Sequence, residues 1–147
     1  MFDYEKYEEE CEKIRQENEE YLRLFREYLI QCGLSDNTIK RHMRNADFYI
    51  NTFMLYEDAN RMPLGVSSID MFLDDFFIRK CGWSTPGTIR TMATSIKKFY
   101  YCMYLHGKIE KSDYDELCET IKDEMPTWRL HCAMYNDTSM PNPFRFM

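Results

Sequence analysis

Hydrophobic side chains recur through the first thirty residues at alternating intervals of four and three positions. The stripe they form comprises Tyr7, Cys11, Ile14, Asn18, Tyr21, Phe25, Tyr28 and Cys32. This spacing places every member on one face of an α-helix, although Asn18 is fully polar. The pattern therefore predicts one long helix that is closed by Gly33 as its C-cap.

The same periodicity predicts a second and a third helix. Ser35 is a suitable N-cap for a second helix that runs to about Tyr56, and the stretch "DANRMPLGV" after it is predicted to be a loop. Ser67 or Ser68 begins a shorter third helix that ends near Gly82. The positions expected to face inward are Ile39, Met43, Ala46, Ile50 and Phe53 in the second helix, and Ile69, Phe72, Leu73, Phe76 and Phe77 in the third.

A fourth helix is predicted to begin at Thr85 and Pro86, because a capping residue followed by proline is typical of a helix start. Gly107 marks its end. The positions expected to face inward are Ile89, Met92, Ile96, Phe99 and Met103.

A fifth helix is predicted after Gly107, with Ser112 as its cap. Its inward positions are Leu117, Ile121 and Met125. Pro126, Pro141 and Pro143 are expected to break up the tail, which has room for one more short helix around residues 128–135. No segment carries a convincing strand pattern, so the predicted fold class is all-α.

Composition places the chain in a broad class. Its 147 residues, 44% of them hydrophobic and 16% aromatic, suffice for the core of one domain. No apolar run approaches the roughly 20 residues of a membrane span, and the acidic N-terminus does not resemble a signal peptide. The six cysteines form no Cys-x-x-Cys pair. These features predict a cytoplasmic protein with reduced thiols.

The formal net charge of −6 argues at first against nucleic-acid binding, but the charge is unevenly distributed. Residues 1–31 contain ten acidic and five basic side chains, whereas residues 81–108 contain four basic side chains and no acidic one. The phrase "CGLSDNTIKRHM" at 32–43 has a near-copy, "CGWSTPGTIRTM", at 81–92. The helices that begin with this repeated phrase are the basic ones.

The outward faces of the two repeated helices combine long cations with short hydroxyl and amide side chains. Those faces consist of Asn37, Lys40, Arg41, Arg44 and Asn51 on the second helix, and Arg90, Thr91, Thr94, Lys97, Lys98 and Tyr101 on the fourth. Such residues contact phosphates in protein–DNA interfaces, and Tyr101 at the margin could pack on a sugar. A solvated face that is basic by chance is the alternative. His42 beside this face is expected to be a surface histidine, which would touch phosphate only when protonated.

Three segments together resemble the core-binding, or SAM-like N-terminal, domain of tyrosine recombinases of the phage-integrase type. They are "FREYLIQCGLSDNTIKRH", "SSIDMFLDDFFIRK" and "STPGTIRTMATSIKKFYYCMYLHGKI". The family's module has a helix, then GLS-x-x-T opening a second helix, a short third helix, and S-x-x-T-I opening a fourth that runs into an aromatic FY and G-x-I. The resemblance covers about residues 21–125, and its soft hydrophobic motifs identify a module rather than a chemistry.

The resemblance implies an orthogonal bundle of four to five helices that forms half of a clamp on duplex DNA through its second and fourth helices. Carried over by position, it implicates eleven DNA-binding residues. They are Thr38, Lys40, Arg41, Arg44, Thr85, Thr88, Arg90, Thr91, Thr94, Lys97 and Lys98. In that family the catalytic residues belong to a separate C-terminal domain, and only about twenty residues follow residue 125 here. Strand exchange is therefore not expected from this chain, and a separate recombinase would be its partner.

Other candidate chemistries have little support in the sequence. Asp74 and Asp75 are adjacent, so on a helix they would point about 100° apart and are expected to be solvated. His131, Cys132 and Cys118 lack the spacing of a metal site. No P-loop, glycine-rich phosphate loop or Ser/Cys-His constellation occurs. The sequence therefore predicts no enzyme activity, metal or cofactor.

The acidic N-terminal helix suggests protein interaction instead. Its stripe continues beyond what a four-helix core needs, and Asn18 resembles the polar residue that fixes register in coiled coils. A homodimer through residues 5–20 is one prediction. The alternative is that Tyr7, Cys11 and Ile14 fold back on Trp128 and Met134 of the tail.

Three regions are thus predicted: an acidic extension of the first helix over residues 1–20, the integrase-like helical domain over 21–125, and a tail over 126–147. The predicted function is a non-catalytic module that binds double-stranded DNA, with an accessory role in DNA integration or recombination. The alternative is a helical protein-interaction scaffold derived from that module, without DNA binding.

Overall fold

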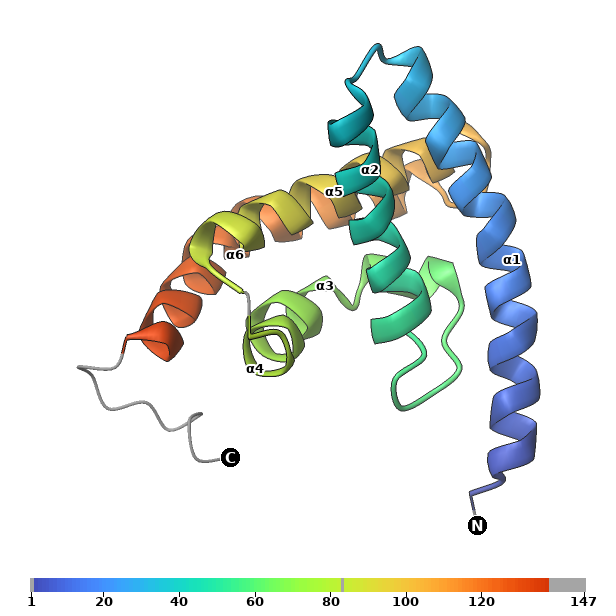
Figure 1. Ribbon diagram of the computed structural model, residues 1–147, viewed down its shortest axis with the longest axis horizontal. Coiled ribbons are helices and arrows are strands. Elements are labelled where there is room, and N and C mark those ends of the chain that lie inside the picture. Colours follow the sequence, from blue (N-terminus) through green and yellow to red (C-terminus); the bar gives the residue numbers. More distant parts are fainter. Residues whose placement is uncertain (1, 83, 138–147) are drawn as a thin grey trace.

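The computed structural model describes residues 2–82 and 84–137, and most of these residues are helical (Figure 1). The helices are α1 (Tyr4–Gln31), α2 (Asp36–Asp47), α3 (Ile69–Met71), α4 (Phe77–Lys80), α5 (Pro86–Leu105) and α6 (Lys111–Asn136). Two segments are π-helical: η1 (Phe48–Phe53) continues α2, and η3 (Phe72–Phe76) joins α3 to α4. A third segment, η2 (Met62–Val66), is a 3-10 helix. No β-strand occurs in the described residues, so the all-α prediction is confirmed.

The helices pack as a bundle with crossing axes. The pair α5 and α6 lies side by side and antiparallel, while α2 crosses α5 and contacts it (Figure 1). The long helix α1 packs on α2 and α5, and its N-terminal part extends past them. The segment from α3 to α4 packs against α6 through α3 and η3. This arrangement agrees with the predicted orthogonal bundle.

The repeated phrase folds into two equivalent helix starts. Ser35 Oγ accepts a hydrogen bond from the backbone N–H of Thr38 at 3.3 Å, and Thr85 Oγ1 accepts one from Thr88 at 3.1 Å. A side-chain oxygen at this position satisfies a backbone donor that has no partner within the helix. Gly33, just after α1, adopts φ +75°, a left-handed conformation that glycine reaches without steric cost.

Apolar side chains from all the helices form one main core. Of the positions predicted to face inward in the second to fourth helices, Met43 and Phe53 are half-buried and the others are buried. Helix α1 contributes Phe25 and Leu29, both fully buried, and Phe25 meets Phe99 edge-on at 5.3 Å between ring centroids. The 3.6-residue period was therefore sufficient to identify the core-facing side of each of these helices.

The two π-helical segments face each other across this core. In η1, Met54 N–H donates to the carbonyl of Tyr49, five residues earlier, at 3.0 Å. Phe53 from η1 then lies 4.8 Å from Phe72 and 5.1 Å from Phe76 of η3, measured between ring centroids. The second predicted helix ends at Phe53, a little before Tyr56, and part of the predicted loop after it forms η2.

Helix α6 corrects two predictions about the C-terminal region. Its N-cap is Glu110 rather than Ser112, because the Asp113 carboxylate accepts a hydrogen bond from the Glu110 backbone N–H at 3.0 Å. The expected break at Pro126 is wrong, since α6 continues unbroken to Asn136. A proline inside a helix removes one backbone hydrogen bond, here to the carbonyl of Lys122, and both residues are exposed to water.

Tertiary contacts hold the second half of α6 in place. Trp128 has no exposed surface, and its Nε1–H donates to Asp70 Oδ1 at 2.7 Å. His131 Nδ1 donates to Asp74 Oδ1 at 2.7 Å. These contacts offset the roughly 3 kcal/mol that an interior proline costs. The short helix expected around residues 128–135 is therefore the end of α6, while residues 138–147 of the predicted tail lie outside the described part of the chain.

The N-terminal stripe packs on the segment that follows η1, and not on the tail. Cys11 and Ile14 form a small cluster with Leu55, and the Tyr7 hydroxyl donates to the Leu55 carbonyl. The predicted contact with Trp128 and Met134 is therefore wrong for these residues.

Asn18 has an intramolecular role in this arrangement. It has no exposed surface, and its Nδ2 donates to Ile50 O at 3.2 Å and to Asn51 Oδ1 at 2.7 Å. The polar residue that suggested a coiled coil thus joins α1 to η1. A homodimer through the N-terminal helix stays a prediction.

Replacing either buried isoleucine near the repeated caps should strongly destabilise the fold. Ile39 and Ile89 are 5% and 0% exposed, so Ile39→Ala and Ile89→Ala should each lower the free energy of unfolding by about 2–5 kcal/mol. Ser35→Ala and Thr85→Ala remove only the cap bond and should cost about 1 kcal/mol each. Urea denaturation of the four variants measures these values. Unchanged urea midpoints for both isoleucine variants would contradict the prediction that Ile39 and Ile89 hold equivalent buried positions in their helices.

Removing residues 1–16 should leave the main core folded, because Asn18, Phe25 and Leu29 remain in place. If the N-terminal helix drives dimerisation, the truncated protein alone should sediment as a monomer. A full-length protein that is monomeric at high concentration would contradict the homodimer, and loss of the cooperative melting transition on truncation would contradict the independence of the core.

Candidate nucleic-acid interface

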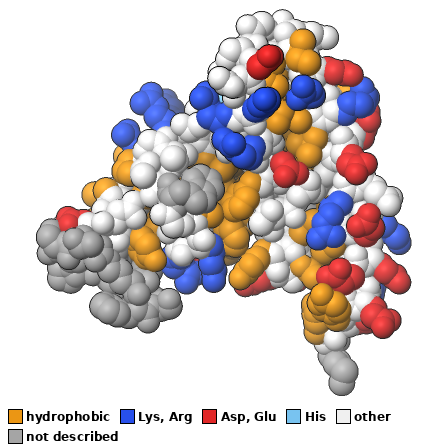
Figure 2. Space-filling view, viewed as in Figure 1, with side chains coloured by type: hydrophobic (Ala, Val, Ile, Leu, Met, Phe, Trp, Pro, Cys, Tyr) orange, Lys and Arg blue, Asp and Glu red, His pale blue; other side chains and the backbone are white. Residues whose placement is uncertain are grey.

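Helices α2 and α5 present six cations on their outer sides. Lys40, Arg41, Arg44, Arg90 and Lys97 are exposed, and Lys98 is half-buried. Figure 2 shows Lys and Arg side chains gathered where α2 crosses α5, while acidic side chains follow α1. The structure therefore brings the cations of two segments that are fifty residues apart onto one side of the molecule.

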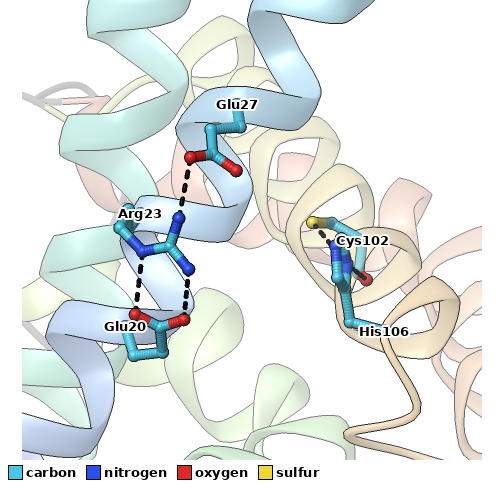
Figure 3. A network of polar contacts seen from close by, with 5 residues as sticks. All are labelled: Glu20, Arg23, Glu27, Cys102 and His106. Atoms are coloured by element: carbon cyan, nitrogen blue, oxygen red, sulfur yellow. Dashed lines mark hydrogen bonds and ion pairs between the residues drawn. The ribbon is translucent and has the colours of Figure 1, made fainter.

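These six cations have no carboxylate partner in the described part of the chain. Every ion pair found there lies outside α2 and α5. On α1, by contrast, Arg23 is held between Glu20 and Glu27, with Nη1 2.7 Å from Glu27 Oε1 (Figure 3). A cation that is not paired with a carboxylate keeps most of its attraction for an added anion, so the α2/α5 face favours phosphate more than the total charge suggests.

A buried polar cluster holds α2 against α5 beneath this face. Ser95 Oγ donates to the Thr91 carbonyl at 3.1 Å and accepts a hydrogen bond from Asn45 Nδ2 at 3.0 Å. His42 Nδ1 lies 2.7 Å from the same oxygen. A hydroxyl has one hydrogen to donate and two lone pairs, so full satisfaction of Ser95 requires the His42 tautomer that carries its proton on Nδ1. The cluster fixes the position of one basic helix relative to the other.

His42 is therefore not the surface histidine that the sequence suggested. It is 4% exposed, and burial together with the positive charges of Arg41 and Lys98 lowers its pKa. A buried imidazole favours its neutral form, because the charged form would lose its hydration. Since cations from both helices act on one imidazole, Arg41 of α2 and Lys98 of α5 lie near the same point of the crossing.

The predicted threonines are less available for phosphate than the cations. Thr85 Oγ1 donates to Thr88 Oγ1 at 3.3 Å, and Thr88 Oγ1 donates to the Thr85 carbonyl at 2.9 Å. Thr91 and Thr94 donate to backbone carbonyls one turn earlier, at 3.1 and 2.9 Å, and Thr38 accepts from the Ser35 hydroxyl at 2.9 Å. Four of these hydroxyls already donate to protein oxygens, so the six cations and the Thr38 hydroxyl, which accepts here but does not donate, are the groups left to bind an anion.

Two features of this region were not predicted from the sequence. The His42–Asn45–Ser95 cluster was assigned to no role, although His42 and Asn45 lie one position before Met43 and Ala46, at the edge of the buried stripe. The second is a groove beside Lys97 and Lys98 that is lined by tyrosines from three helices. Of these, only Tyr101 lay on the predicted face.

The other candidate chemistries are accounted for by structural contacts. Asp74 binds His131, and Asp75 pairs with Arg79 at 2.6 Å between oxygen and Nε. Within the described ranges, no group of three His, Cys, Asp or Glu side chains is placed to hold a metal ion. None of the described helices has the length and apolar character needed to cross a membrane.

Comparison with known proteins leaves the family open. No protein family, no curated protein and no solved structure matches this chain.

Burial of His42 should make the fold less stable in mild acid. The unfolded chain takes up a proton below a pH of about 6.5, where the folded protein resists protonation. The free energy of unfolding should therefore fall as pH decreases from this value, by at most about 1.4 kcal/mol per pH unit for this one group. Urea denaturation between neutral and mildly acidic pH measures the slope.

Two variants separate the titration from the loss of packing. His42→Asn keeps a polar side chain but cannot titrate, so it should lose this part of the pH dependence. Ser95→Ala removes a hydrogen-bond partner but keeps the histidine, so it should be less stable at every pH and retain the slope. A His42→Asn protein with the wild-type slope would contradict the assignment.

Proposed function

We propose that this protein is a non-catalytic module that binds double-stranded DNA through α2 and α5. The observation that carries the proposal is the face of six cations, none of which pairs with a carboxylate in the described residues. Phosphate binding by lysine and arginine supplies most of the affinity of sequence-independent DNA recognition.

The rigidity of the face supports the same function. The buried Ser95 cluster and the core residues Ile39 and Ile89 fix both helices before any ligand arrives. Helices that are already fixed need no ordering of their backbone when DNA binds, which lowers the free-energy cost of association. Helix starts capped by Ser35 and Thr85 place the two basic faces in the same phase relative to the core.

The resemblance to the core-binding domain of tyrosine recombinases supports an accessory role in DNA integration or recombination. That family uses its second and fourth helices on DNA, and the unpaired cations lie on the corresponding α2 and α5. In this proposal the strand-exchange chemistry belongs to a separate recombinase. The protein would bind duplex DNA beside it or together with it.

A protein-interaction scaffold is the second candidate, and one groove favours it. This groove, of about 370 Å³, lies between η1 and η3 and includes Phe53, Tyr56, Met71 and Phe76. Met71 and Tyr56 are 68% and 52% exposed and line this groove together with Phe53 and Phe76, and contiguous exposed apolar surface is typical of interaction sites. A partner that covers them would not need the cations of α2 and α5.

Charge reversal distinguishes DNA contact from bulk electrostatics. Changing Lys40, Arg44, Arg90 and Lys97 to Glu should weaken duplex binding by roughly a hundredfold or more, because each change removes a phosphate partner and adds a repulsion. The matched control reverses four exposed cations elsewhere, at Lys6, Lys13, Lys122 and Arg129. Both variants shift the formal net charge from −6 by the same amount, so only the control should keep most of the affinity.

Fluorescence anisotropy with a labelled duplex at several salt concentrations provides the measurement. If all six cations reach phosphates, log affinity should fall against log salt with a slope of about −5, and the α2/α5 variant should have a much smaller slope. Equal losses in the two variants would show that only net charge matters. Absence of binding by the wild type at low salt would favour the scaffold.

A further inference from the structure

A groove of about 340 Å³ opens at the edge of the basic face, where α1, α5 and α6 meet. It is lined by Tyr28, Thr94, Lys97, Lys98, Tyr101 and Tyr114. Its volume is at the lower end of the range for sites that bind small organic groups. Two of the cations of the proposed DNA face thus also border an aromatic recess.

The tyrosine rings are held by contacts with one another. Tyr101 lies 6.1 Å from Tyr28 and 5.3 Å from Tyr114, measured between ring centroids, and Tyr104 stacks on Tyr114 at an angle of 15°. Because each ring packs against another from a different helix, the walls of the groove are formed in advance. Tyr104 supports Tyr114 but does not line the groove.

The charge of the groove suits an aromatic group that carries a phosphate. Among the described residues that line it, two are lysines and none is acidic. Burial and a contact with Cys32 raise the pKa of Tyr28 to about 12, so this hydroxyl adds no negative charge to the groove. The aromatic walls offer stacking surfaces, while Lys97 and Lys98 offer a phosphate site.

We propose that this groove binds an unpaired nucleobase of a DNA strand, with the adjoining phosphate on Lys97 and Lys98. A base in a closed duplex is stacked and paired, so the groove can accept one only at a single-stranded end or gap. Tyrosine stacking tolerates any base, because every base has a π face. The inference rests on the proposed function, since the duplex next to such an end would lie on α2 and α5.

Three labelled DNAs test the inference on the wild-type protein. They are a blunt duplex, the same duplex with a short single-stranded tail, and the same duplex with a tail of equal length that lacks bases. The abasic tail carries the same phosphates, so it controls for charge. The tail with bases should bind roughly tenfold more tightly than the abasic tail, as expected for stacking of one base.

Two matched variants locate the effect on the protein. Tyr101→Leu keeps an apolar side chain but removes the ring between Tyr28 and Tyr114, so it should abolish the preference for the tail with bases. Tyr21→Leu changes a half-buried tyrosine of α1 that does not line the groove and should keep the preference. Circular dichroism checks that both variants fold. If either variant does not fold, the comparison of the tail with bases and the abasic tail on the wild-type protein still tests the inference.

The outcomes separate this inference from the proposed function. Blunt-duplex binding with equal affinity for both tailed DNAs would overturn the groove assignment and leave duplex binding intact. A preference for the tail with bases, without binding of the blunt duplex, would support base binding in the groove and contradict duplex binding by the α2/α5 face. A free deoxynucleoside monophosphate that binds more tightly than the tail would overturn the assignment to a DNA strand.

Discussion

The crossing of α2 and α5 is the contact on which the candidate interface depends, and it is made by a small number of polar atoms. Ser95 Oγ accepts from Asn45 and lies 2.7 Å from His42 Nδ1, while apolar residues of both helices surround this cluster. Buried polar groups are costly unless every donor and acceptor is satisfied, so this geometry permits few alternative alignments of the two helices. A shift of either helix would leave a buried hydroxyl or amide without its partner.

This constraint explains how an acidic protein can present a basic face. Four acidic residues of α1 pair with arginines of the same helix or of the neighbouring segment, as in the contacts of Glu20 with Arg23 and of Glu17 with Arg61. The cations of α2 and α5 form no such pairs in the described residues: α5 contains no acidic residue, and Asp36 and Asp47 at the ends of α2 make no ion pair. Electrostatic attraction falls steeply with distance in salt, so a phosphate near α5 responds to the local cations more than to distant carboxylates.

Local patterns were enough to predict the first four helices, the caps at Ser35 and Thr85, and the core positions of the second to fourth helices. Each of these depends on residues within a turn or two of one another, so spacing and capping chemistry contain the information. The outward cations follow from the same phase, since Lys40 and Arg90 lie about 100° around the helix from the buried Ile39 and Ile89, outside the apolar stripe. The sequence thereby determined the all-α fold and the two faces that carry the functional proposal.

Tertiary structure alone decided what those local patterns left open. His42 is buried because Ser95, 53 residues later, lies opposite it. Helix α6 continues through Pro126 because Asp70 and Asp74 bind its second half. The N-terminal stripe packs on Leu55, and three helices place their tyrosines around one groove. Contacts between residues so far apart leave no periodic pattern along the chain, because each depends on how whole helices pack and not on the residues within one turn.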